Sequence, residues 1–278
     1  MIRTFCPGHI TCFFRPVRTG DMATTGSIGA GIRISLGSKV VLEERSDDKV
    51  VVTMDGIESD AKVTRCLMES MAPGRGYDVT VTNDLPVGQG FGMSAAGAIA
   101  TALALSGDID DAFLRAHRAE IEGGGGLGDV SALSLPVHQP VRVRAGIPPH
   151  GEVIGTGIEF RTLTLAVVGR KMHTGSVLDD RDVCTRMESV GESCVRRFMD
   201  DPTEKRLFSL SGEFSRSVGL ESEDVRKALD LLAPHGNAGM CMLGHSIFTT
   251  LPEDEVREIL GDVPTYSCSS TDELPRFL

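Results

Sequence analysis

The stretch that most constrains this chain is "DLPVGQGFGMSAAGAIATALAL", residues 84–105. Gly88, Gly90 and Gly92 alternate directly before a run of small residues that predicts a helix beginning at Ser94. Glycine adopts positive φ at little cost, so the backbone N–H groups of such a loop can converge on one point. The first N–H groups of a helix lack internal partners, and the helix dipole adds positive potential there. The stretch therefore predicts an anion site, most often one for phosphate.

Three kinds of nucleotide loop compete for this stretch. A Walker loop requires a lysine in G-x-x-x-x-G-K-[ST], and the stretch has none. A dinucleotide loop, G-x-G-x-x-A, fits Gly90 to Ala95, but Asp110, about 20 residues on, lies on no predicted strand. The third kind is another phosphate loop, in which the Ser94 hydroxyl is a ligand at the helix start. A purely structural alternative, a tight turn into a closely packed helix, stays open beside them.

Composition narrows the classes of partner. The net charge of −11 over 278 residues argues against nucleic acid or an anionic membrane as main partner, because both attract basic surfaces. No apolar run approaches the roughly 18 residues that a membrane span needs. The seven cysteines form no C-x-x-C pair and are expected to be free thiols. We therefore expect a cytoplasmic protein, and the charge does not exclude a small anionic ligand held by local donors.

The order of predicted elements divides the chain into two domains. The first 60 residues alternate strands and turns, with a break at Pro7-Gly8, and a short helix, a half-exposed strand and the glycine stretch follow. The second half predicts a strand, three helices, a glycine loop with a strand, a helix and a last strand. We expect an N-terminal α/β domain at 1–150, a C-terminal α+β domain with a mainly antiparallel sheet at 151–278, and the active site between them.

Helix signals also mark the segment after the glycine stretch. Asp110 or Asp111 is expected to cap a helix, which four glycines from Gly123 to Gly126 would end. The segment that follows these glycines, "LGDVSAL", predicts a further short helix. These signals predict two helices that the four glycines separate.

Three segments carry a family resemblance. "LPVGQGFGMSAAG" resembles the second motif of the GHMP kinases, usually Pro-x-Gly-x-Gly-Leu-Gly-Ser-Ser-Ala-Ala. "FCPGHI" and "GNAGMCMLGHSIFTT" are similar to the first and third motifs, and the three lie in the family's order along the chain. The resemblance implies an α+β, two-domain GHMP kinase fold, with a ribosomal-protein-S5-like N-terminal half and a ferredoxin-like C-terminal half.

Within this superfamily, "CPGHITCFF", "GSIGAGIRI" and "GGGGLGDVSAL" most resemble archaeal pantoate kinases. The resemblance implies an enzyme that uses ATP and Mg²⁺ to phosphorylate the primary hydroxyl of pantoate, giving 4-phosphopantoate for coenzyme A biosynthesis. The alternatives are another family member (a homoserine, mevalonate or shikimate kinase) and a non-catalytic GHMP-fold nucleotide-binding protein. A small hydroxy acid is the expected partner, no nucleic acid or membrane is expected, and a homodimer is left open.

The resemblance also implies which residues hold the nucleotide. Ser94 matches the family's second serine, whose hydroxyl touches Mg²⁺ and a phosphate, and Met93 stands where the first serine usually is. At Met93 the loop is therefore expected to hold phosphate through its backbone N–H. The residues expected around the phosphates are Pro86, Gly88, Gly90, Gly92, Ser94 and Ala95.

Phosphoryl transfer gives acidic residues two roles, as a metal ligand and as a carboxylate beside the attacking hydroxyl. Glu120, before the four glycines, matches the family's Mg²⁺ ligand, with Glu122 as a rival if the helix register differs. A solvated helix face is the alternative for Glu120. Asp129, after the glycines, matches the aspartate that faces the substrate hydroxyl, and it is also a candidate helix N-cap.

His9 departs from the family pattern. Mevalonate kinases carry a lysine immediately after the Pro-Gly of the first motif, and this chain has histidine. Because the charge of histidine is adjustable near neutral pH, we hypothesise that His9 supports Asp129 or the transferring phosphate. The alternative is a histidine that is bonded only to the loop backbone.

The carboxylate of a hydroxy acid needs a cation or a nest of N–H groups. Arg33 and Arg142 are candidates, and Arg142 and Arg144 alternate with valines, which predicts that they share one face of a strand. No role is assigned to His173. The residues predicted to bind the substrate are Ser27, Arg15, Arg144 and His245.

Overall fold

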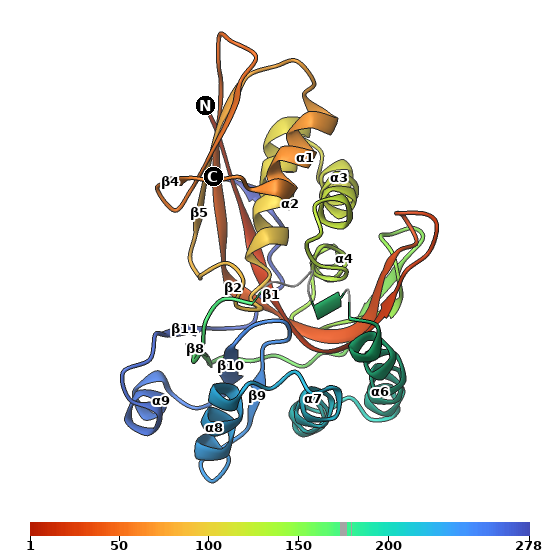
Figure 1. Ribbon diagram of the computed structural model, residues 1–278, viewed down its shortest axis with the longest axis vertical. Helices are drawn as coiled ribbons and strands as arrows, with labels where there is room; N and C mark the ends of the chain where they lie inside the picture. Colours follow the sequence, from red (N-terminus) through yellow and green to blue (C-terminus); the bar gives the residue numbers. More distant parts are fainter. Residues whose placement is uncertain (173–176, 179) are drawn as a thin grey trace.

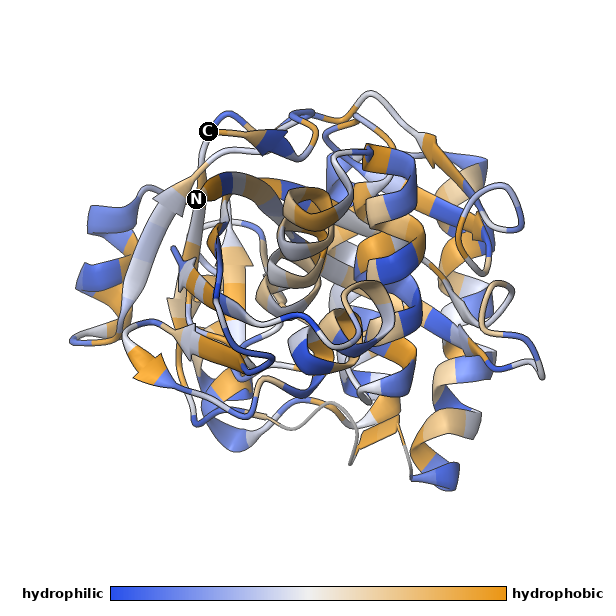
Figure 2. Cartoon of the chain, turned by 90° about the horizontal axis from the view of Figure 1, so that it is seen from above, coloured by the Kyte–Doolittle hydropathy of each residue, from blue (hydrophilic) through white to orange (hydrophobic). Residues whose placement is uncertain are grey.

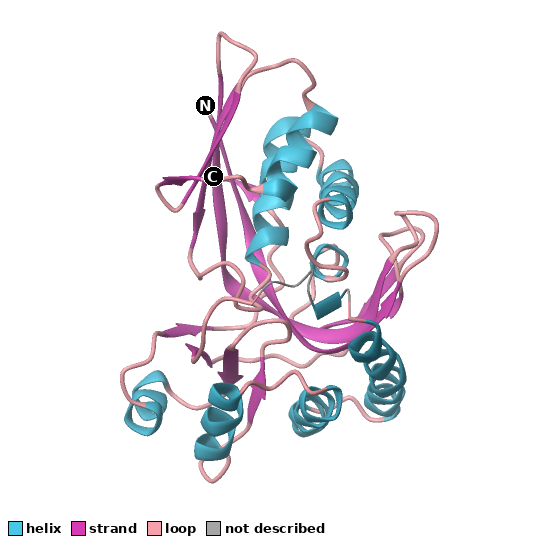
Figure 3. Cartoon of the chain, in the orientation of Figure 1, coloured by secondary structure: helices cyan, strands magenta, loops and turns pink. Residues whose placement is uncertain are grey.

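The chain folds around two β-sheets. The computed structural model describes residues 1–172, 177–178 and 180–278. The larger sheet has eight strands and the smaller one four. One group of helices lies beside the larger sheet and a second group lies along the outer side of the smaller sheet (Figures 1 and 3). Among the described helices, none combines the length and the apolar character that a membrane crossing requires.

Most elements follow one another in the order that the sequence predicts, but the strands Glu152–Gly155 and Arg276–Phe277 are not among those expected. The strands are β1 (Ile2–Val17), β2 (Gly26–Glu44), β3 (Val50–Met54), β4 (Ile57–Glu58), β5 (Tyr77–Asn83), β6 (Pro140–Arg144), β7 (Glu152–Gly155), β8 (Leu163–Val167), β9 (Ala238–Met240), β10 (Ser246–Thr249), β11 (Thr265–Cys268) and β12 (Arg276–Phe277). The helices are α1 (Lys62–Met71), α2 (Met93–Ser106), α3 (Ile109–Glu122), α4 (Asp129–Leu133), α6 (Arg181–Asp200), α7 (Glu204–Val218), α8 (Glu223–Leu232) and α9 (Glu253–Leu260).

The two sheets differ in strand direction. The larger sheet has the order β12-β1-β2-β5-β3-β4, and β6 joins it by pairing with β2 and β7. Its strands are antiparallel except for the pair β3 and β5. The smaller sheet, β11-β8-β10-β9, is antiparallel throughout, as predicted. A domain division at residue 150 stays a prediction, and β7 and β12, which follow that residue, pair within the larger sheet.

The long strands β1 and β2 pair along most of their length and reach from the larger sheet toward α6 (Figure 1). The predicted break at Pro7-Gly8 is wrong, because β1 continues through this pair with a shift of register against β2. A β-bulge absorbs an extra residue without ending the strand. Directly after it, the His9 N–H donates to the Phe91 carbonyl at 3.1 Å, so the first motif is tied to the glycine loop.

Helix α2 is buried along nearly its whole length, from Met93 to Ala104. It begins at Met93, one residue before the predicted start. Its small residues let the sheet approach closely: a Cβ atom on Gly97 would lie 3.4 Å from a Val81 methyl carbon. The Thr4 hydroxyl donates to the Ala100 carbonyl at 2.7 Å. The alanine-rich sequence therefore places the glycine loop at one end of a tightly held helix.

Helix α3 is capped by Asp108, and the predicted caps Asp110 and Asp111 are wrong. The Asp108 carboxylate accepts the Asp111 N–H at 2.8 Å. Asp110 and Asp111 lie in the first turn instead, where the helix dipole favours negative charge. Figure 2 shows hydrophobic and hydrophilic residues alternating along most helices, in agreement with one face packed on a sheet.

Candidate active site

The glycine loop has the backbone conformation that its sequence predicts. Gly88, Gly90 and Gly92 have φ values of +80°, +76° and +69°. A Cβ atom on Gly90 would lie 2.7 Å from the Cys241 carbonyl oxygen, and one on Gly92 would lie 2.8 Å from that of His9. Glycine is therefore required at both positions by conformation and by space. Because the loop leads directly into α2, its N–H groups lie beside the free N–H groups of the first helical turn.

A cavity of about 600 Å³ opens beside this loop. Its walls come from β1, β2, the glycine loop, α3 with the four glycines, α4, β6 and the segment after β8. The fold thus brings together residues that are far apart in the sequence. The predicted site residues that line the cavity are Ser27, Gly88, Gly90, Gly92, Ser94, Glu120 and Asp129.

Glu120 is buried at the cavity wall and is held by two donors. The Ser94 hydroxyl donates to one carboxyl oxygen at 2.5 Å, and the Gly126 N–H donates to the other at 2.6 Å. Burial raises the pKa of Glu120 to about 7, although both hydrogen bonds favour the charged form. Glu122, its rival, is exposed and does not line the cavity. The helix register therefore places Glu120 beside the glycine loop.

Asp129 forms a pair with His9. The His9 Nδ1 lies 2.8 Å from an Asp129 carboxyl oxygen, and the Thr11 hydroxyl donates to the same oxygen at 3.4 Å. Burial lowers the pKa of His9, so at neutral pH the neutral ring donates its Nδ1–H to Asp129. Burial alone would raise the pKa of Asp129, but the hydrogen bond from His9 and the charge of Arg142 hold it below its ordinary value. Asp129 is the first residue of α4, and Gly128 is the N-cap, so the N-cap interpretation of Asp129 is wrong.

Arg142 reaches the same cavity from β6. Its side chain is 1% exposed, and all three guanidinium nitrogens lack a hydrogen-bond partner within the described residues. Burial lowers its pKa to about 10, which still leaves it charged at neutral pH. Cβ atoms on Gly29 and Gly128 would each come within 2.9 Å of the guanidinium, so glycine on both sides makes room for it. A buried cation with free donors, at the wall of a cavity, is suited to bind an anion.

Two of the predicted arginines lie outside the cavity. Arg15 is 3.9 Å from Glu192 at the surface. Arg144 is exposed and donates to the His150 carbonyl at 2.6 Å. A shift of register between Arg142 and Arg144 separates the two arginines that alternation would place on one face. The structure therefore brings Arg142, and not Arg144, to Asp129.

The remaining predicted residues that the structure describes do not line the larger cavity. The ring of His245 donates from Nδ1 to a backbone carbonyl at 2.7 Å and does not line the cavity. Arg33 is fully buried and donates to carbonyl groups of the backbone. Pro86 precedes the lining part of the loop, and Ala95 is buried within α2. His173 lies outside the described residues.

A second cavity of about 290 Å³ adjoins the first. Its apolar walls include Met54, Val63, Val81 and Val87. No sequence pattern singles out these residues, because apolar side chains on strands and helices usually belong to the core. The same is true of Lys62 and Lys171, which line both cavities and which the sequence does not distinguish from surface lysines.

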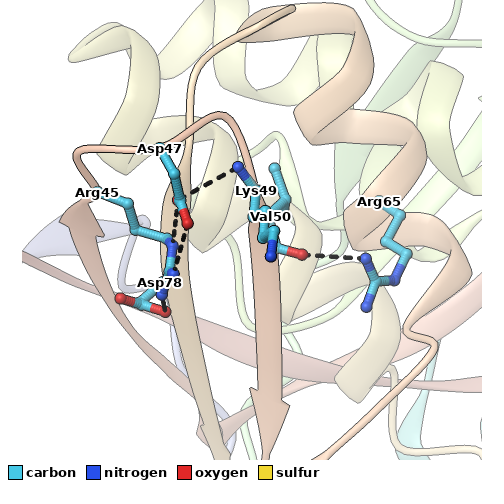
Figure 4. A network of polar contacts seen from close by, with 6 residues as sticks. All are labelled: Arg45, Asp47, Lys49, Val50, Arg65 and Asp78. Atoms are coloured by element: carbon cyan, nitrogen blue, oxygen red, sulfur yellow. Dashed lines mark hydrogen bonds and ion pairs between the residues drawn. The ribbon is translucent and has the colours of Figure 1, made fainter.

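Arg65 on α1 holds one wall of the second cavity. Its guanidinium donates to the carbonyl groups of Asp60 at 2.8 Å, Val50 at 3.1 Å and Ser59 at 3.3 Å. Figure 4 shows Arg65 reaching the Val50 carbonyl. Nearby, Arg45 pairs with Asp47 and Asp78 at the turn between β2 and β3. The bonds from Arg65 hold the segment that precedes α1 and Lys62.

The acidic side chains of the cavity fit a magnesium site in which protein side chains and nucleotide phosphates would both bind the ion. No cluster of three or more metal-ligating side chains occurs in the part of the chain that the structure describes. Mg²⁺ is usually held by one or two carboxylates together with substrate phosphates and water, so such a cluster is not needed. Glu120 and the Ser94 hydroxyl offer oxygen ligands directly beside the glycine loop.

Comparison with known proteins gives a consistent result. Residues 61–135 match the family model of the GHMP kinases N terminal domain. A pantoate kinase of Thermococcus kodakarensis is 31% identical, over 95% of this chain and 93% of the relative. A solved structure described as a phosphotransferase related to the CoA biosynthesis pathway superposes with a TM-score of 0.86 at 29% identity, covering 100% of this chain and 98% of the other.

More distant structures share only the fold. A mevalonate kinase superposes with a TM-score of 0.65 at 14% identity, over 98% of this chain and all of the other. The GHMP kinase fold and the resemblance carried by the three motifs are both confirmed. The chain belongs to the pantoate kinase family of the GHMP kinases.

Proposed function

We propose that this protein transfers the γ-phosphoryl group of ATP to the primary hydroxyl of pantoate, giving ADP and 4-phosphopantoate. Its family membership supports this activity. The observation that carries the proposal is one cavity whose walls include the glycine loop and a carboxylate beside a buried cation, which has no hydrogen-bond partner among the described residues. This is the arrangement that a kinase for a hydroxy acid requires.

The nucleotide would occupy both cavities. The apolar walls of the smaller cavity suit a nucleoside, and the glycine loop with the start of α2 suits the phosphates. Met93 is 3% exposed and packs in the core, so at this position the backbone N–H would serve the phosphate. Its methyl end lies against β1, because a Cβ atom on Gly8 would collide with it.

Glu120 and Ser94 would hold Mg²⁺ together with the phosphates. The ion would neutralise charge on the phosphates. In the ligand-free protein the Ser94 hydroxyl donates its hydrogen to Glu120. A carboxyl group with a pKa of about 7 is partly protonated at neutral pH, so a bound cation would displace its proton.

The acceptor would lie between Arg142 and Asp129. Arg142 would bind the pantoate carboxylate, with Ser27 beside it on β2. The hydroxyl oxygen forms a bond to the γ-phosphorus as the bond to the β,γ-bridging oxygen breaks, and Asp129 takes the hydroxyl proton. His9, which donates to Asp129, would keep that carboxylate in one orientation. It is a positioning residue, because its second ring nitrogen is buried against Gly31.

A kinase assay with pantoate, mevalonate, homoserine and shikimate tests the proposal. We expect ATP-dependent phosphorylation of pantoate and slow or undetectable transfer to the other three. Transfer to homoserine but not to pantoate would contradict the substrate, and no transfer to any of them would contradict the activity. Nucleotide binding without turnover, unchanged in Asp129→Asn, would instead favour a non-catalytic binding protein.

A further inference from the structure

The two cavities meet at a shared boundary. The residues that line both are Lys62, Val87, Met93, Ser94, Gly123 and Lys171. A ligand with an apolar end in the smaller cavity and a polyphosphate on the glycine loop must cross this boundary. Side chains here therefore contact the part of such a ligand where the nucleoside joins its phosphates.

Two of these boundary residues, Lys62 and Lys171, are cationic. Neither Lys62 nor Lys171 forms an ion pair or side-chain hydrogen bond among the described residues. Lys171 lies on the glycine loop itself, since a Cβ atom on Gly88 would come 2.6 to 3.1 Å from its Cγ, Cδ and Cε atoms. The adjacent Met172 N–H donates to the Gly88 carbonyl at 3.0 Å. These contacts place the aliphatic part of the Lys171 side chain against the glycine loop.

Besides the boundary lysines Lys62 and Lys171, Arg142 is the only cationic side chain among the described residues that line the larger cavity. Asp60, Glu120 and Asp129 are acidic, and Arg142 lies beside Asp129 at the acceptor side. His9 is buried and donates to Asp129, so it presents no charge to the loop. A polyphosphate carries several negative charges, and its transfer depends on positive groups that neutralise them.

We propose that Lys171 binds the phosphates of the nucleotide at the glycine loop, together with the N-terminus of α2. The proposal rests on the proposed function, since it assigns a residue to the same nucleotide site. Lys171 follows β8 in the second half of the chain, whereas the glycine loop belongs to the first half. The hydrogen bond from the Met172 N–H to the Gly88 carbonyl already connects the two halves of the chain. A nucleotide bound by both Lys171 and the glycine loop would add a second connection.

Nucleotide binding, measured by displacement of a fluorescent ADP analogue, tests this role. We expect Lys171→Met to weaken the binding of ADP and ATP roughly 10- to 100-fold, the range for loss of a charged contact. Lys171→Arg should restore binding to within about threefold of the wild type, and adenosine binding should not change. Lys227→Met is the matched control, because Lys227 is an exposed lysine on α8.

The outcomes separate this inference from the proposed function. Wild-type protein that neither binds ADP nor phosphorylates pantoate would contradict the proposed function. Wild-type protein that does both, while Lys171→Met binds ADP as tightly as the wild type, would contradict only the role of Lys171. Equal weakening for ADP and adenosine would also overturn it, because the lysine would then act by packing and not by charge.

Discussion

Glu120 and Asp129 are two carboxylates of one cavity, yet their environments shift their acidity in opposite directions. Both lie close to Gly126: a Cβ atom there would be 3.4 Å from a Glu120 carboxyl oxygen and 3.3 Å from one of Asp129. Burial raises the pKa of Glu120, while a histidine and an arginine hold that of Asp129 low against the same effect. Two acids beside one glycine turn thus differ in pKa, so that at neutral pH Asp129 is ionised and Glu120 is partly protonated.

The difference in pKa indicates which ligand each carboxyl group suits. Glu120 accepts from a hydroxyl and a backbone N–H and pairs with no positive side chain of the described residues, so a metal ion would supply the cation that it lacks. Asp129 already has its counter-charge in Arg142 and its orientation from His9, so it is ionised before any ligand arrives. The first carboxylate suits a metal, and the second suits a hydroxyl that gives up a proton.

The sharpest way to break this comparison is Asp129→Asn. The amide keeps the shape but cannot take the hydroxyl proton, so we expect kcat for pantoate to fall by roughly 10²- to 10⁴-fold. ADP affinity should stay within about threefold of the wild type, because Asp129 is assigned to the acceptor hydroxyl and not to the nucleotide phosphates. A variant that retains more than a tenth of wild-type kcat would contradict the role assigned to Asp129.

Removing the counter-charge of Asp129 should have the next largest effect. We expect Arg142→Met to lower kcat/KM for pantoate by roughly 10²- to 10³-fold, as expected for loss of one partner of a buried charged contact. The pKa of Asp129 should rise toward its ordinary value, visible as a shift of the lower limb of the kcat/KM profile to higher pH. Arg144→Met is the matched control, and an equal effect of both variants would contradict the assignment.

Because the pKa of Glu120 is raised in the folded protein, the free energy of unfolding should depend on pH. Below about pH 4.5 the carboxyl group is protonated in both folded and unfolded chains. Between about pH 4.5 and 7 the folded protein keeps a proton that the unfolded chain has lost, so this contribution to stability falls as pH rises. The full loss is on the order of 3 kcal/mol and is reached above about pH 7.

Denaturant titration from pH 4 to 8 in the absence of ligands measures this effect. The free energy of unfolding of Glu120→Gln should lack the decrease that the wild type shows across this range. Glu122→Gln changes an exposed neighbour on the same helix and should follow the wild-type profile. Parallel profiles for wild type and Glu120→Gln would rule out a buried, neutral Glu120.

The smallest expected effect concerns His9, which acts through Asp129. We expect His9→Ala to lower kcat about tenfold, the lower range for loss of a group that orients another, with little change in the KM for ATP. His9→Asn, which can still donate to Asp129, should recover part of the loss. Near-wild-type turnover of His9→Ala would remove the role of His9 in catalysis.

The sequence predicted local features well because local chemistry decides them. The glycine loop, the helix of small residues, the half-exposed strand and the antiparallel sheet of the second half are all confirmed. The wrong predictions lie at the boundaries of elements: the break at Pro7-Gly8, the cap of α3, and Asp129 as an N-cap. A bulge or a cap shifted by one or two residues costs little free energy, so residue type alone does not fix it.

Only the folded structure distinguishes between residues of the same type that are candidates for one role. Four arginines were candidates for the substrate carboxylate, and only the shift of register in β6 separates Arg142 from Arg144. Glu120 and Glu122 are two residues apart on one helix, and packing alone decides which is buried. No sequence motif pointed to Lys171. Its place beside the glycine loop follows from the contact between the segment after β8 and Gly88.

The sequence by itself determined the family, the phosphate loop and the types of group that the chemistry needs, because motifs record backbone conformation and side-chain identity over short distances. Only the tertiary structure decided the charge of each group and its partner. The pairing of His9 with Asp129 joins segments more than 100 residues apart in the chain. The Arg142 guanidinium, which has no hydrogen-bond partner among the described residues, is buried in part against Gly29, also more than 100 residues away. Such long-range contacts set the local electrostatics, and no short stretch of sequence contains them.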